Sequence, residues 1–169
     1  MNLARNLSLK MTPISPLQLK QHFFTLSSIR ANPKGSSKAE MLLEPAISFQ
    51  KQGEQSNEWT LGLRVVIRSA KPEAPFLYEI DIEIQGLVEV HNNFPAEKRE
   101  QLAVINGLGM LYSAAREMIL NVTARSVHGP MSLPTLNFVE IVSNLKGQQL
   151  QKGIKAEGSP ADQKPTTPG

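Results

Sequence analysis

The sequence predicts an α+β domain: a four-stranded antiparallel sheet with a long helix and a C-terminal helix packed on one face. Two observations lead to this prediction. Between residues 17 and 90, four segments alternate apolar and polar side chains, the two-residue period of a strand. Between residues 104 and 145, apolar residues recur at spacings of three and four, the period of a helix. Strands that precede the helices are typical of α+β architecture.

The first two strands are predicted over residues 17–29 and 41–50. The first carries apolar residues on both parities, so we expect it to be bulged or buried on both faces. These residues are Leu17, Leu19, Phe23 and Ile29 on one parity and Phe24 and Leu26 on the other. The second strand alternates regularly, but Pro45 lacks an amide proton, which predicts an edge strand or a break.

Residues 59–68 and 76–90 predict an antiparallel hairpin, the clearest local pattern in the chain. One register matches opposite charges on one face and apolar side chains on the other. Its pairs are Arg68–Glu79, Arg64–Glu83, Ile67–Ile80 and Val65–Ile82. Each such pair contributes about 0.2–1 kcal/mol, and a shift by one residue would lose all of them.

The main helix is predicted over residues 108–122. A short helix over residues 96–105, which follows Pro95, is expected to end or bend at Gly107 and Gly109 before it. The main helix is apolar over most of its circumference, so it must be covered on two sides. Its own sheet can supply one cover, and we expect a second subunit to supply the other. The predicted oligomer interface is Leu108, Leu111, Tyr112, Ala115, Met118, Ile119 and Val122.

The last helix is predicted to begin at Asn137. Glu140 follows three residues later, which is the spacing of a capping box. Gly153 is expected to end this helix. Residues 153–169 contain three Pro, three Gly and almost no large apolar residue, a composition that predicts a disordered tail. We therefore expect the folded domain over residues 15–152.

The start of the chain is basic, within a net charge of +3, and no acidic residue precedes Glu40. We expect a flexible basic extension at residues 1–14. Such a segment can attract nucleic acid, anionic lipid or an acidic partner, or it can be a solvated end. Since no nucleic-acid motif accompanies it, nucleic-acid binding is not expected.

Composition limits the remaining possibilities. The chain has no cysteine, which excludes disulfides, thiolate metal sites and cysteine nucleophiles. No apolar run approaches the ~18 residues that a membrane span needs, so membrane insertion is not expected. The N-terminus lacks the continuous apolar core of a signal peptide. These features favour a cytoplasmic protein.

No group of residues predicts catalysis. The histidines are far apart, and none has a carboxylate or second ligand at metal spacing: they are His22, His91 and His128. Three carboxylates, Glu79, Asp81 and Glu83, share one strand face and could supply oxygen ligands. Arginines face them in the predicted register, so a charged solvent face is the simpler interpretation. We expect no enzyme activity, no metal and no cofactor.

Two motifs resemble the SecB family of protein-export chaperones. Residues 111–117, Leu-Tyr-Ser-Ala-Ala-Arg-Glu, are similar to that family's long-helix core, where an aromatic residue, a proline and then Ala-Arg-Glu stand. Residues 133–138, Leu-Pro-Thr-Leu-Asn-Phe, are similar to the family's Leu-Ala-Pro-Val-Asn-Phe before its last helix. The family's helix proline is Ser113 here. The family has the α+β fold predicted above, so the two lines of reasoning agree.

The resemblance implies an ATP-independent holdase that binds unfolded or precursor proteins in apolar grooves for protein export. It also implies a homotetramer, a dimer of dimers with the long helices between two sheets. Apolar burial is non-directional and yields about 25 cal/mol per Å², so one groove accepts many sequences. The implied groove residues are Met41, Leu43, Phe49, Trp59, Phe138, Ile141, Val142 and Leu145. The sequence leaves open which of them are groove wall and which are core.

The family also delivers clients to the SecA translocation motor through an acidic sheet surface. Leu77 and Glu79 stand where the family's motor-binding strand has Leu and Glu, so they are the implied docking residues. Arg30, in contrast, stands where the family has a glutamate. Two functions therefore stay open. One is a general holdase that serves export, and the other is a dedicated chaperone for a single partner, such as an antitoxin, that does not dock to the motor.

Overall fold

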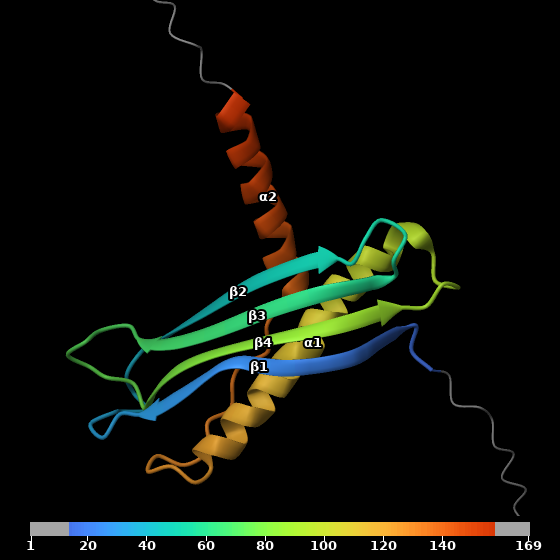
Figure 1. Ribbon diagram of the computed structural model, residues 1–169. Helices are drawn as coiled ribbons and strands as arrows, with labels where there is room; N and C mark the ends of the chain where they lie inside the picture. Colours follow the sequence, from blue (N-terminus) through green and yellow to red (C-terminus); the bar gives the residue numbers. More distant parts are fainter. Residues whose placement is uncertain (1–13, 158–169) are drawn as a thin grey trace, which may run out of the picture. The chain divides into compact units, whose positions relative to one another are not determined.

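Four strands form an antiparallel sheet in the first part of the chain. The computed structural model describes the backbone of residues 14–157 and the side chains of residues 14–147. Its strands are β1 (Leu17–Ala31), β2 (Met41–Lys51), β3 (Glu58–Ser69) and β4 (Tyr78–Val90), in the order β1-β4-β3-β2 (Figure 1). Every neighbouring pair is antiparallel. The predicted four-stranded antiparallel sheet is therefore confirmed.

The predicted register between β3 and β4 is also confirmed. The aligned pairs include Arg64–Glu83, Val65–Ile82 and Ile67–Ile80. Apolar residues of the two strands thereby share one face, where Val65, Ile67 and Ile82 are fully buried. The ladder ends before Arg68 and Glu79, so these two residues are not an aligned pair.

The two edge strands differ in regularity. The register of β1 against β4 shifts between Leu19 and Gln21 and again between Phe24 and Leu26, so of the two predicted alternatives the strand is bulged. At the opposite edge of the sheet, β2 pairs with β3 alone. Pairing continues through Pro45, so this proline marks an edge strand and not a break.

A continuous helix replaces the short and main helices predicted from the sequence. α1 (Ala96–Thr123) begins after Pro95 and runs through both internal glycines, so the predicted interruption at Gly107 and Gly109 is wrong. Gly107 is buried where a Cβ would collide with the Leu61 side chain, and the lack of a side chain lets the helix lie close to the sheet. An interior glycine costs a helix only about 1 kcal/mol relative to alanine, which this packing can offset.

α1 packs on one face of the sheet, against β1, β3 and β4 (Figure 1). We call this the inner face and the opposite one the outer face. The predicted oligomer-interface residues divide between the two sides of α1. Five of them are buried inside the subunit: Leu108, Leu111, Tyr112, Ala115 and Ile119. The subunit's own fold accounts for the apolar character of these five, whereas Met118 is half-buried and Val122 is exposed. The oligomer interface stays a prediction.

The segment after α1 runs back along the helix. The Met131 amide donates a hydrogen bond to Thr123 Oγ1 at 2.8 Å, and the Tyr112 hydroxyl donates to the Pro134 carbonyl at 2.6 Å. Met131 and Leu133 are buried. Burial also raises the pKa of the Tyr112 hydroxyl. The segment thus covers the side of α1 on which Tyr112 lies.

The chain divides into two compact units, Met1–Pro134 and Thr135–Gly169. The second contains α2 (Phe138–Glu157). α2 continues through Gly153, so the predicted helix end at that residue is wrong. Residues 1–13 of the predicted extension and residues 158–169 of the predicted tail lie outside the described residues.

Candidate functional site

Alternate residues of β2 form an apolar strip on the inner face. We call Met41, Leu43, Ile47 and Phe49 the β2 strip. Their partners on β3 belong to the inner face, as when Leu43 lies opposite Ile67, and directly opposite residues in an antiparallel pair point to the same side. All four strip residues are half-buried, and so is Pro45, which has the same parity. The residues that alternate with them lie on the outer face and are exposed.

The β2 strip differs from the core because α1 does not extend over it. Within the described residues, α1 has no packing against β2 comparable to that against the other strands. On neighbouring β3, Leu61, Leu63 and Val65 are at most 1% exposed. The strip therefore retains apolar surface that a partner could remove from water.

Trp59 lies in the interior at the end of the β2 strip. It is 3% exposed, and the Lys51 ammonium lies 5.8 Å from the centre of its ring, within the range of a cation–π contact. The indole N–H is buried and meets no acceptor in the described part of the chain. Among the predicted groove residues of this unit, Met41, Leu43 and Phe49 are thus accessible and Trp59 is not.

The other predicted groove residues share one face of α2. They are Phe138, Ile141, Val142 and Leu145, at the i, i+3, i+4 and i+7 positions of a helical stripe. Phe138 and Val142 are buried, and the other two are half-buried. The Glu140 amide donates a hydrogen bond to Asn137 Oδ1 at 3.4 Å, which confirms the predicted N-cap. That this stripe and the β2 strip line one groove stays a prediction.

Ion pairs join the strands on the outer face. Arg64 donates two hydrogen bonds to the Asp81 carboxylate, at 2.8 and 2.7 Å, and Lys20 pairs with Glu89 at 2.8 Å. Arg64 thus reaches Asp81 diagonally instead of Glu83, the residue directly opposite. The hydrogen bond from Arg64 is the main reason that the pKa of the Asp81 carboxyl lies below its usual range.

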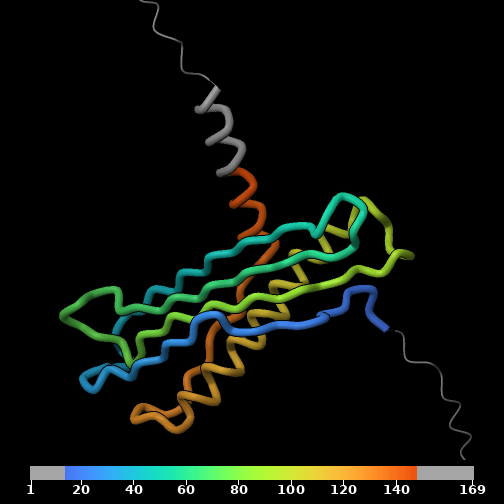
Figure 2. The backbone as a smooth tube through the Cα atoms, viewed as in Figure 1, coloured from blue at the N-terminus to red at the C-terminus, as the bar shows by residue number. Residues whose placement is uncertain are grey.

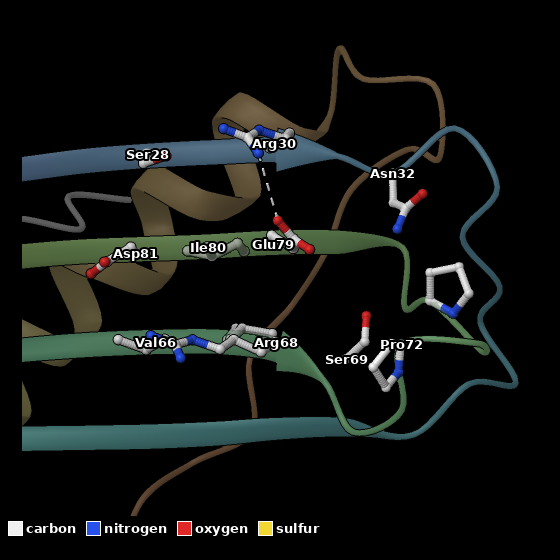
Figure 3. Close-up of a pocket in the computed structure, with 12 residues that line it drawn as sticks. Ser28, Arg30, Asn32, Val66, Arg68, Ser69, Pro72, Glu79, Ile80 and Asp81 are labelled. Carbon is white, nitrogen blue, oxygen red and sulfur yellow. Dashed lines mark ion pairs between the residues drawn. The ribbon is translucent and has the colours of Figure 1, made fainter.

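A hollow of about 510 Å³ lies on the outer face, where β1 and β3 end and β4 begins (Figure 3). The loops after β1 and β3 meet at this end of the sheet (Figure 2), where the Asn32 amide donates to the Leu77 carbonyl at 2.9 Å. Of the two predicted docking residues, Leu77 is half-buried and Glu79 is exposed. Glu79 lines the hollow beside Arg30, 3.9 Å away. The Arg30 guanidinium therefore faces the carboxylate of Glu79, the residue that was expected to belong to an acidic docking surface.

Some accessible apolar residues were missed by the sequence interpretation. Ile47 belongs to the β2 strip, and the alternation that selected Leu43 and Phe49 also includes it. On the outer face, Phe23 and Leu42 are 50% and 46% exposed. The signal for Phe23 was the presence of apolar residues on both parities of its strand.

Two further properties concern the described residues only. Neither helix there is long and apolar enough to cross a membrane. No three of the described His, Asp and Glu side chains are grouped so that they could hold a metal ion. The accessible apolar strip is therefore the strongest candidate site in this part of the chain.

One solved structure supports this fold. A SecB-like chaperone of Mycobacterium tuberculosis, solved in complex with a ChAD peptide from the HigA1 antitoxin, matches with a TM-score of 0.55 and 16% identity, over 71% of this chain and 90% of that chain. A protein of unknown function from Streptococcus agalactiae matches over 70% of this chain and 97% of its own, with a TM-score of 0.41 and 14% identity. No curated protein sequence matches.

The family assignment comes from the sequence itself. The family described as SecB, preprotein translocase subunit SecB, matches residues 26–149. This range begins within β1, includes the other three strands and all of α1, and ends within α2. The structural match at 16% identity supports the fold alone, but the family match spans most of the chain. The chain belongs to the SecB family.

Proposed function

We propose that this protein is an ATP-independent holdase that binds unfolded or precursor proteins through the β2 strip. Membership of a chaperone family supports a chaperone role. The observation that carries the finer proposal is the accessible apolar strip on β2, in the same sheet as β3 and β4, whose inner-face residues are buried. Such a strip can bind many sequences, since apolar burial is non-directional. The proposed compartment is the cytoplasm, with protein export as the process served.

Aggregation suppression tests this function. Several unrelated unfolded proteins are diluted from denaturant with and without the chaperone, and light scattering is followed. We expect suppression of each at near-stoichiometric chaperone, without nucleotide. Because burial of apolar surface is not screened by ions, suppression should change little between low and physiological salt. A variant lacking residues 1–13 serves as the control for the basic N-terminus and should behave like the parent.

The opposite outcome identifies a charge-driven interaction. Activity that falls steeply with salt, and that disappears with residues 1–13, would contradict the holdase proposal. The proposal would also be contradicted if the protein suppressed the aggregation of none of the clients at any salt concentration.

A dedicated chaperone for one partner, such as an antitoxin, is the second candidate. The pairing of Arg30 with Glu79 favours it, since a cation occupies the surface through which family members with an acidic face would dock to the SecA motor. The solved SecB-like relative bound to an antitoxin peptide is consistent with this alternative. Suppression of a single client, together with motor binding that appears only in Arg30→Glu, would favour the dedicated role over the general one.

We also propose that the working unit is a homotetramer. On the side of α1 away from the sheet, Met110 is 36% and Leu120 is 41% exposed, and a second copy of the chain would cover them. The double variant Met110→Glu, Leu120→Glu should sediment as a smaller species with an unchanged far-UV spectrum. The matched control is Glu117→Gln, an exposed position on the same side, which should leave the mass unchanged. A monomeric parent protein would contradict the proposal.

A further inference from the structure

The hydrogen bonds at the two ends of β2 show which of its N–H and C=O groups point to β3 and which point to the open edge of the sheet. Before the strand, the Ala70 amide donates to the Glu40 carbonyl at 2.9 Å, and after it the Gln52 amide donates to the Glu58 carbonyl at 2.9 Å. The register between these points is unbroken, and bonded residues alternate in an antiparallel pair. Even-numbered residues of β2 therefore direct their N–H and C=O groups to β3. Odd-numbered residues direct theirs away from the sheet.

The outward backbone groups belong to the same residues as the apolar strip. Met41, Leu43 and Ile47 each present a side chain to the inner face and an N–H and a C=O to the open edge. Pro45 has the same parity, but it presents only its carbonyl, because proline has no amide proton. No described strand lies beyond β2. Apolar contact and main-chain hydrogen bonding are thus available along one line.

We propose that a bound client segment adds to the sheet as a fifth strand, antiparallel to β2, and that Pro45 divides its hydrogen bonding into two halves. The inference rests on the holdase function proposed above and specifies how the client is held. Antiparallel pairing matches the rest of the sheet. Addition of a strand to a sheet edge gives affinity through the main chain and selectivity through alternate side chains.

The edge also indicates the chemistry of the segment. Its residues opposite Leu43 and Ile47 are apolar, since they share the inner face with the strip. Glu44 is the only charged residue between residues 41 and 50, it is exposed, and its side chain lies on the outer face. The segment therefore carries a basic residue opposite Glu44, on the parity that alternates with its apolar residues. Pro45 leaves one client carbonyl without a donor.

A synthetic peptide tests this arrangement directly. The probe has the 11-residue length of β2, with alternating Leu and Ser and a single Lys on the Ser parity to pair with Glu44. Its residues are N-methylated one at a time, which removes one donor each. In the antiparallel arrangement the Leu residues carry the bonded amides. Each N-methyl-Leu should weaken binding about two- to tenfold, and each N-methyl-Ser should leave it within about twofold.

Pro45→Ala tests the division of the strand. It restores the missing donor, so the unmodified peptide should bind about two- to tenfold more tightly. Pro33→Ala is the matched control, because Pro33 is exposed in the loop after β1, and it should leave affinity unchanged. Melting temperatures of both variants are measured, so that a change in stability is not mistaken for a change in affinity. Replacement of the peptide Lys by Glu should weaken binding.

The outcomes separate this inference from the holdase function. Peptide binding without a two-residue period in the N-methyl series would overturn the added strand and leave the holdase proposal intact. Losses at Ser positions alone would overturn the antiparallel arrangement. If Pro45→Ala instead raises the mass in sedimentation with unchanged peptide affinity, β2 pairs with a second copy of this chain and the proposal is wrong. Failure of the parent protein to suppress aggregation would contradict the holdase function itself.

Discussion

The inner face of the sheet has two regions that look alike in sequence and differ in structure. On β3, Leu61 and Leu63 alternate with more polar residues and are at most 1% exposed. On β2, Leu43 and Ile47 alternate in the same way, yet they remain half-buried. The difference arises because α1 packs against β1, β3 and β4 and does not extend over β2. Whether an apolar residue is core or binding surface therefore depends on where the helix lies.

Two glycines determine how closely α1 lies over the middle of the sheet. A Cβ at Gly86 of β4 would come within 2.7 Å of Leu111 Cδ2, and a Cβ at Gly107 of α1 would collide with Leu61. Both positions thus allow a close contact between helix and sheet. The helix packs against β3 and β4, as well as β1, and does not extend over β2.

The largest expected effect contrasts matched leucines on the two strands. Leu63→Ala removes a fully buried side chain, so the free energy of unfolding should fall by about 2–5 kcal/mol. Leu43→Ala removes a half-buried side chain, which leaves a smaller cavity, and should cost less than half as much. Urea denaturation of both variants measures the difference. Equal losses would mean that the β2 strip is ordinary core.

A second contrast concerns the two glycines of α1. Gly107→Leu should lower the free energy of unfolding by about 1–3 kcal/mol, because the new side chain has no room against Leu61 and Val88. Gly109→Ala should raise it by up to about 1 kcal/mol, since nothing lies within 4 Å of a Cβ there and alanine favours the helix. Changes of the same sign in both variants would contradict the position assigned to α1.

The fold was largely predictable because its signals are local. Strand alternation, together with the matched residues of the β3–β4 hairpin, was enough to predict the sheet and the register of that hairpin. The helix was misread at Gly107 because a glycine reads as a helix breaker in sequence. Its packing against Leu61 is long-range information. Gly153 was read as a helix breaker in the same way, whereas α2 continues to Glu157.

The candidate site was predictable only in part. Pro45 indicated an edge strand, and alternation indicated which β2 residues share a face. Neither signal could separate Leu43, which is accessible, from Trp59, which is buried, because burial depends on the position of α1 and on neighbouring strands. The ion pairs were equally hidden. Arg64 forms its hydrogen bonds with Asp81 rather than with Glu83, the residue opposite it, and this pairing depends on side-chain geometry.

The smallest expected effect concerns the outer face. Asp81→Asn removes the carboxylate that Arg64 binds, and it should cause a slight loss of stability at pH 7, as exposed ion pairs contribute little. Since the folded-state pKa of Asp81 lies below 3.8, its contribution is present above that pH and is lost as the pH falls through the lowered pKa. The difference between parent and variant should therefore shrink in acid. Glu83→Gln is the control, and an equal pH-dependent loss there would contradict the assigned pair.

The most direct test of the central claim compares adjacent leucines on opposite faces of β2. Leu43 lies on the strip, and Leu42, which is 46% exposed, lies on the outer face. Leu43→Ser and Leu42→Ser make the same chemical change one residue apart. The affinity of each variant for one unfolded client is measured at a temperature where both are folded. We predict that Leu43→Ser weakens binding about tenfold, because it removes an apolar side chain that the bound client would bury. Leu42→Ser should leave the affinity within about twofold. Equal affinities for the two variants would contradict the assignment of client binding to the β2 strip.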